Sequence, residues 1–209
     1  MKKSLLILSL FTSIITVSCQ KELSDPTVTP PTNGGGGGGG SNGGGGGTGG
    51  ASIVGNWKFV SMSATTQAIA QVSVAGMTIK SVTTSDYTST NNVGTVTITS
   101  STISSNGIGY DLAFTAHSTT YQNGVSAGTY DQPYSYSVPP TSGVSNYTQV
   151  NADSIYMTAQ GMGQGYHLAL NGNILKMTTY IVKDTTVDIS GMPAQMHESA
   201  TQVSTLQKQ

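Results

Sequence analysis

From Ile53 onward, apolar and polar residues alternate with a period of two, and no helical period is evident. Alternation of this kind is typical of strands with one buried and one exposed face. One segment shows it most clearly, since one of its faces carries Ile108, Tyr110, Leu112, Phe114 and Ala116 and the other carries Gly109, Asp111, Thr115 and His117. A second segment puts Tyr130, Tyr134, Tyr136 and Val138 on one face and Asp131, Ser135 and Ser137 on the other.

Further strands are predicted near residues 57–63, 69–83, 95–99, 145–159, 166–170, 174–183 and 197–207. Asn171-Gly172-Asn173 separates two apolar runs and predicts a tight hairpin turn, and Gly161–Gly165 predicts a second turn. Pro133 should lie at an edge or a bulge, because proline cannot donate to a β-ladder. Eight to ten short strands favour an all-β fold, either an antiparallel up-and-down barrel or a sandwich.

The first 52 residues have a different composition and divide into two predicted parts. Residues 1–18 resemble a secretory signal peptide, with Lys2 and Lys3 ahead of a short apolar stretch from Leu5 to Val17. Residues 19–52 contain three prolines and then a nearly pure glycine run, which predicts a flexible linker. The β domain is therefore expected to span residues 53–209.

Cys19 is the single cysteine of the chain, and it stands directly after the apolar stretch. Thr16-Val17-Ser18-Cys19 resembles a bacterial lipobox, which implies that Cys19 carries the lipid attachment. Gln20-Lys21-Glu22 is similar to the export signal of Bacteroidota surface lipoproteins. We therefore expect an outer-membrane lipoprotein, anchored by its N-terminal lipid and facing the cell exterior.

The start of the domain resembles a known family. Ile53-Val54-Gly55-Asn56-Trp57-Lys58-Phe59 is similar to the Gly-x-Trp first strand of calycins, and in particular of lipocalin-like domains in Bacteroidota lipoproteins. The final stretch, residues 201–208, is similar to the last strand of those domains. The resemblance implies a lipocalin-like barrel with Gly55 and Trp57 at its closed base. Lipocalins place an arginine over this tryptophan, whereas this chain has no arginine.

Candidate catalytic chemistry is sparse. The three histidines, His117, His167 and His197, are not paired in sequence, so we expect surface side chains and neither a metal site nor a catalytic site. The net charge is −1 and charged residues make up 8% of the chain, so there is no basic cluster to bind nucleic acid. We expect no enzyme and no cofactor.

Two hypotheses for the domain remain open. In the first, the barrel binds a small apolar or amphipathic ligand, lined by Phe59, Tyr110, Phe114, Tyr134 and Tyr136. In the second, the barrel interior is packed, and the domain is a structural or interaction module of the envelope whose protein partner the sequence does not identify.

Overall fold

The computed structural model describes residues 52–159, 162–189 and 192–209. The predicted signal peptide, Cys19 and the predicted linker up to residue 51 lie outside these residues. Within the described part of the chain, no helix has the length and the apolar character needed to cross a membrane.

Nine antiparallel β-strands make up the described residues. They are β1 (Gly55–Val74), β2 (Met77–Thr88), β3 (Thr90–Ile98), β4 (Thr102–Gln122), β5 (Val125–Asn151), β6 (Ser154–Ala159), β7 (Met162–Asn171), β8 (Ile174–Ile189) and β9 (Met192–Lys208). The sheet order is β2-β1-β3-β4-β5-β6-β7-β8-β9, and the added pairings β1–β9 and β2–β4 close it into a ring. The predicted all-β, antiparallel, up-and-down barrel is confirmed.

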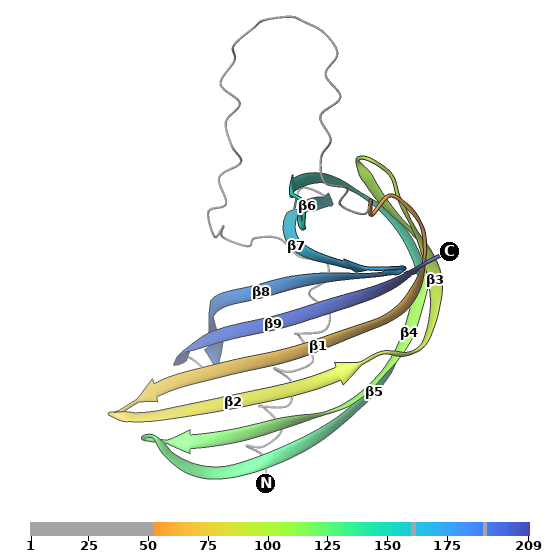
Figure 1. Cartoon of the computed structure of the whole chain (residues 1–209). Coiled ribbons are helices and arrows are strands. Elements are labelled where there is room, and N and C mark those ends of the chain that lie inside the picture. Colours follow the sequence, from red (N-terminus) through yellow and green to blue (C-terminus); the bar gives the residue numbers. More distant parts are fainter. Residues whose placement is uncertain (1–51, 160–161, 190–191) are drawn as a thin grey trace, which may run out of the picture. The chain divides into compact units, whose positions relative to one another are not determined.

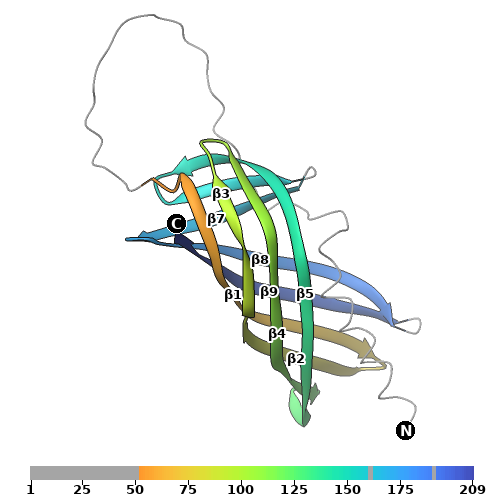
Figure 2. The same cartoon turned by 90° about the vertical axis from the view of Figure 1, so that its right-hand side faces the viewer.

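Strands β2 and β3 share one position in this ring. β3 pairs with β1 over Gly55–Lys58, and β2 pairs with β1 over Ser63–Val74. On the other side, both strands pair with successive parts of β4, which runs beside them for its whole length. Figure 2 shows β3, β4 and β5 side by side.

The two ends of the barrel differ because β6 and β7 are short. β6 pairs with β5 only over Asn146–Asn151, and β7 pairs with β8 only over Ile174–Thr178. Beyond these points, β5 pairs only with β4 and β8 only with β9 among the described strands. The closed end therefore has a complete ring, whereas the open end is a curved sheet in the order β8-β9-β1-β2-β4-β5 (Figure 1).

The hydrophobic core lies at the closed end. A β-bulge between Phe59 and Ser61 adds one residue to β1, so that Trp57 and Phe59 before it and Met62 and Ala64 after it are all buried on the inward face. The buried cluster comprises Trp57, Phe59, Met62, Val96, Ile98, Ile103, Leu112, Tyr147, Ile155, Leu168, Leu175, Met177 and Leu206.

Gly94 allows β3 and β4 to approach closely beside this core. Its φ is +105°, which L side chains rarely adopt, and a Cβ at this position would lie 2.5 Å from the backbone oxygen of Gly107. The ladder between β3 and β4 is irregular on both sides of Val93.

Several predicted strand boundaries were wrong. The predicted strand 69–83 contains the β1–β2 turn at Ala75-Gly76, and the predicted strand 145–159 contains the β5–β6 turn after Asn151. The glycines at 163 and 165, which were predicted to form a turn, lie within β7. The Asn171-Gly172-Asn173 turn and the edge position of Pro133 are confirmed.

Candidate ligand-binding site

The base of the barrel is built around Trp57. Its side chain is 0% exposed, and its indole Nε1 donates a hydrogen bond to the Ile53 carbonyl over 2.9 Å. Lys208 Nζ lies 5.7 Å from the centroid of the Trp57 ring, a cation–π contact. Gly55 has a φ of +147°, which suits glycine at the entry to β1. The tryptophan therefore closes the core, with a lysine as the covering cation.

A cluster of aromatic rings lies where the packed core gives way to the open end. The ring centroids of Phe59 and Tyr110 are 5.9 Å apart. Phe114 contacts three tyrosines, with centroid distances of 5.0 Å to Tyr87, 5.3 Å to Tyr134 and 6.3 Å to Tyr136. The structure thus brings together all five residues proposed as ligand-lining, on β1, β4 and β5, and adds Tyr87 from β2. We call these six residues the aromatic cluster.

The aromatic cluster is only partly shielded from solvent. Phe59 is buried, whereas the other five rings have intermediate exposure. Burial raises the pKa of Tyr136 from 10.0 to about 12, with a further contribution from the nearby Tyr87 and Tyr110 hydroxyls. Burial also raises the pKa of Tyr87 and of Tyr110. These hydroxyls are therefore neutral at ordinary pH and can donate hydrogen bonds to a ligand beside the rings.

Hydroxyl pairs continue along the inward face of the open end. Thr66 Oγ1 and Ser85 Oγ are 2.7 Å apart, as are Thr83 Oγ1 and Ser118 Oγ. Because the hydroxyls of each pair satisfy one another across neighbouring strands, this part of the inward face is uncharged and moderately polar.

Two charged side chains face inward among the described residues of the open end. The register places Lys183 of β8 opposite Glu198 of β9, next to Ala68 of β1. Thr179 lies four residues from Lys183 in the row of the aromatic cluster, so the charged pair lies about 13 Å from the rings along the strands. The inward face thus combines an aromatic area with a separate charged one.

Two shallow hollows lie on the outward face and do not coincide with the aromatic cluster. One, of 330 Å³, is formed around Ser63, Thr65, Asp86 and Thr201. The other, of 380 Å³, is formed around Gln71, Lys80 and Tyr121. Neither brings aromatic faces together with a charged pair, so the inward face of the open end is the better candidate for a binding surface.

Each of the three histidines pairs with an aspartate: His117 and His197 across neighbouring strands, and His167 with Asp153 in the β5–β6 turn. The nitrogen–oxygen distances are 2.8 Å for His117–Asp131, 3.3 Å for His167–Asp153 and 2.6 Å for His197–Asp184. All six side chains are exposed, and exposed pairs contribute little to stability. The histidines are surface side chains, as predicted, but their aspartate partners were not foreseen.

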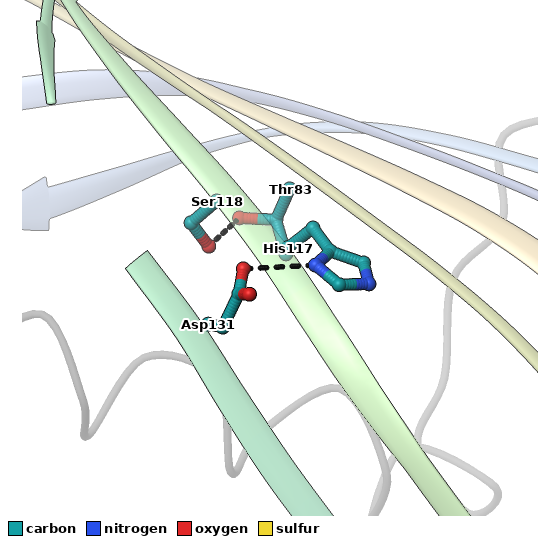
Figure 3. A network of polar contacts seen from close by, with 4 residues as sticks. All are labelled: Thr83, His117, Ser118 and Asp131. Atoms are coloured by element: carbon teal, nitrogen blue, oxygen red, sulfur yellow. Dashed lines mark hydrogen bonds and ion pairs between the residues drawn. The ribbon is translucent and has the colours of Figure 1, made fainter. Parts of the chain in front are cut away.

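The His117–Asp131 pair does not extend to the neighbouring serine. Ser118 follows His117 in β4, but alternate residues of a strand face opposite sides of the sheet. The Ser118 hydroxyl bonds to Thr83 instead (Figure 3). Within the described residues, no group of three or more His, Cys, Asp or Glu side chains is placed to hold a metal ion.

Comparisons with known proteins do not assign a family. The sequence matches no family model and no curated protein. Ail, the attachment invasion locus protein of Yersinia pestis, aligns with a TM-score of 0.23 and 6% identity, over 74% of this chain and 99% of that chain. The translocator domain of the autotransporter NalP from Neisseria meningitidis aligns with a TM-score of 0.20 and 7% identity, over 72% and 88% of the two chains. At such scores, these alignments carry no argument about function.

Proposed function

We propose that this chain is a lipid-anchored lipoprotein of the outer membrane whose β-barrel domain binds a small amphipathic ligand at the aromatic cluster. The observation that carries the proposal is the convergence of partly exposed rings from β2, β4 and β5 above a closed, packed base. Such a surface offers apolar ring faces and neutral hydroxyl donors in the same place.

The inward face also favours an amphipathic ligand over a purely apolar one. A ligand whose apolar part covers Tyr87 would direct its other end toward Glu198 and Lys183, which lie about 13 Å farther along the strands and two and three strands across the sheet from β2. These two side chains offer one positive and one negative partner. A polar or zwitterionic head group therefore suits this end of the surface.

The polarity of the sheet supports attachment through a lipid. The buried apolar side chains face the barrel interior, while the outward face carries residues such as Gln67, Lys80, Thr84 and Asp86. Strands that cross a bilayer show the reverse pattern, with an apolar band facing outward. The lipobox-like sequence ending at Cys19 supplies the expected anchor, and Gln20-Lys21-Glu22 supports display at the cell exterior.

The test uses the β domain, residues 53–209, as an isolated unit and the amphipathic dye 8-anilinonaphthalene-1-sulfonate. We expect the dye fluorescence to rise and saturate as dye is added to the wild-type domain. In Phe114→Ala, the affinity for the dye should fall at least about tenfold, because the ring that contacts three tyrosines is lost. Tyr180→Ala is the matched control, since Tyr180 is exposed on the outward face of β8. Equal binding by both variants would contradict the proposed site.

A packed interaction module is the second candidate function, and the core favours it. Thirteen residues form one buried cluster at the closed end, so a ligand is accommodated only at the open end. If native mass spectrometry of the purified unit finds no bound small molecule and the dye does not bind, this second function replaces the first.

A further inference from the structure

The strand β8 has a long unpaired edge at the open end. From Ile181 to Val187, it pairs with β9 on one side, and no described strand pairs with it on the other. The free edge begins at Ile181 because the Gln164 side chain forms hydrogen bonds with Thr179 and Tyr180, the two residues before it. The Gln164 Nε2 donates to Thr179 Oγ1 over 2.6 Å and to the Tyr180 carbonyl over 3.2 Å.

The opposite edge, on β5, is less suited to pairing. β5 contains Pro133, Pro139 and Pro140, and a proline has no N–H group to donate to a neighbouring strand. β8 contains neither proline nor glycine, and it is rich in β-branched residues. Ile181 and Val182 are 37% and 57% exposed, so the edge carries apolar side chains that are partly open to solvent. Exposed edges of this composition pair readily with another strand.

We propose that the β8 edge pairs antiparallel with β8 of a second copy of this chain, in the register centred on Thr185. The charged residues of β8 favour this register over the neighbouring ones. Centring the pair on Lys183 or on Asp184 would place each of these residues against its own charge. Centring it on Thr186 would pair only residues 185–187 of the edge. Like charges directly opposite one another destabilise a strand pair.

The register centred on Thr185 has no such conflict. Asp184 lies opposite Thr186 of the second copy, and Lys183 lies opposite Val187. A register centred on Val182 also avoids like charges, but it would extend the pairing into the segment that Gln164 covers. In the Thr185 register, the inward-facing side chains of both copies lie on the same side of the strand pair. The open sheets of the two copies therefore join into one continuous sheet.

The pair of β8 strands is the whole contact between the two copies and it is short, so the dimer forms reversibly. A single pair of strands buries much less than the roughly 1,000 Å² of a stable interface. The dimer therefore depends on a high local concentration, such as that of copies anchored in one membrane. This inference does not rest on ligand binding: Lys183 belongs both to the β8 edge and to the proposed ligand surface, but the pairing is formed by the backbone of β8 and needs no ligand.

The first test is disulfide cross-linking of the full chain in its native membranes. In Thr185→Cys, the two Cα atoms would be about 4.5–5.5 Å apart, within the range of a disulfide. In the matched control Val187→Cys, they would be about 14 Å apart. Under mild oxidation with copper phenanthroline, we expect dimer from Thr185→Cys at several times the yield of Val187→Cys or of the wild type, which retains Cys19. Equal yields, or cross-links from the introduced thiol only to other proteins, would overturn the proposal.

The second test adds lysines to the Thr185→Cys chain. Val187→Lys would face Lys183 of the second copy twice per dimer and should lower the cross-linking yield about tenfold. Thr186→Lys would instead face Asp184 and should keep or raise the yield. Short-wavelength Trp57 emission checks that each variant is folded. A folded Val187→Lys chain that cross-links as well as Thr186→Lys would refute the register.

Discussion

At the residue scale, Trp57 is held from three directions. The core surrounds its ring, the Ile53 carbonyl accepts its indole N–H, and Lys208 covers its face. The sequence predicted the buried position of Trp57 because strand alternation and the Gly-x-Trp resemblance agreed. It did not predict the lysine, because β1 and β9 are far apart in sequence and only the closed ring brings them together.

The same limit explains the other residue-level outcomes. The five candidate ring residues were recognisable because they share strand faces within β1, β4 and β5. Tyr87 was missed, because the predicted strand ended at residue 83. The aspartate partners of His117 and His197 were missed as well, although each lies at matching distances from a hairpin turn.

We expect Trp57→Ala to lower the free energy of unfolding by about 3–5 kcal/mol, since it leaves a large cavity in the core. Urea denaturation followed by circular dichroism measures this change. Tyr180→Ala, which removes an exposed ring, should shift it by less than about 0.5 kcal/mol. Native emission of Trp57 at long, water-like wavelengths would contradict its burial.

Gly94→Ala should destabilise the domain by about 2–4 kcal/mol, because the new methyl group meets the Gly107 backbone and the φ of +105° is strained. Gly165→Ala is the control, since nothing lies within 4 Å of a Cβ at that position. Thermal melts of both variants provide the measurement. Similar melting temperatures for the two would show that β3 and β4 are farther apart than described.

The raised pKa of Tyr136 predicts a loss of stability at alkaline pH. The folded value of about 12 exceeds the ordinary 10.0, so the neutral hydroxyl favours the folded state below pH 10. This contribution is lost as the pH rises from 10 to about 12. Phenolate absorbance should show a late ionisation step that disappears in Tyr136→Phe. Its persistence in that variant would assign the step to another tyrosine.

At the element scale, the existence of strands was easier to predict than their ends. Alternation identified strands at 108–117 and 130–138, because each has one clearly apolar face. The Ala75-Gly76 turn was not predicted, because alanine rarely adopts the positive φ of 49° that it has here. The lengths of β6 and β7 could not be predicted from the sequence either, since the length of a strand depends on its pairing partners, which the local sequence does not reveal.

The unequal pairing of β5 predicts a distinct hydrogen-exchange pattern. Between Val125 and Gly143, β5 pairs with β4 alone, so alternate amides should exchange fast and slowly. At Asn146, β5 pairs with both β4 and β6, and from Tyr147 to Gln149 it pairs with β6 instead, so the slowly exchanging amides should change to the other side of the strand. Exchange followed by NMR distinguishes these cases. Uniform protection along the whole strand would mean that another segment covers the β5 edge.

At the scale of the whole molecule, a closed, packed base supports an open and more polar surface. The sequence predicted the barrel, but the open end follows from unequal strand lengths and was not foreseen. The expected attachment of this molecule to a membrane can be tested separately from its fold.

Cys19→Ala should abolish palmitate labelling and move the protein from the membrane fraction to the soluble fraction. The reason is that Cys19 is the single thiol to which a lipid can be attached. Ser18→Ala, next to it, should keep both the label and the membrane location. Labelled, membrane-bound Cys19→Ala protein would contradict the lipoprotein proposal.

The pairing of β1 with β9 also determines when the barrel can form. Trp57 pairs with Lys208, 151 positions later in the chain (208 minus 57). Contacts between residues so distant in sequence form slowly, and the ring cannot close until β9 pairs with both β1 and β8. Until then, β1 and β8 each expose an edge that β9 later covers, and such intermediates aggregate easily. On the proposed route to the outer membrane, the unfinished chain should therefore depend on a holdase chaperone that protects it.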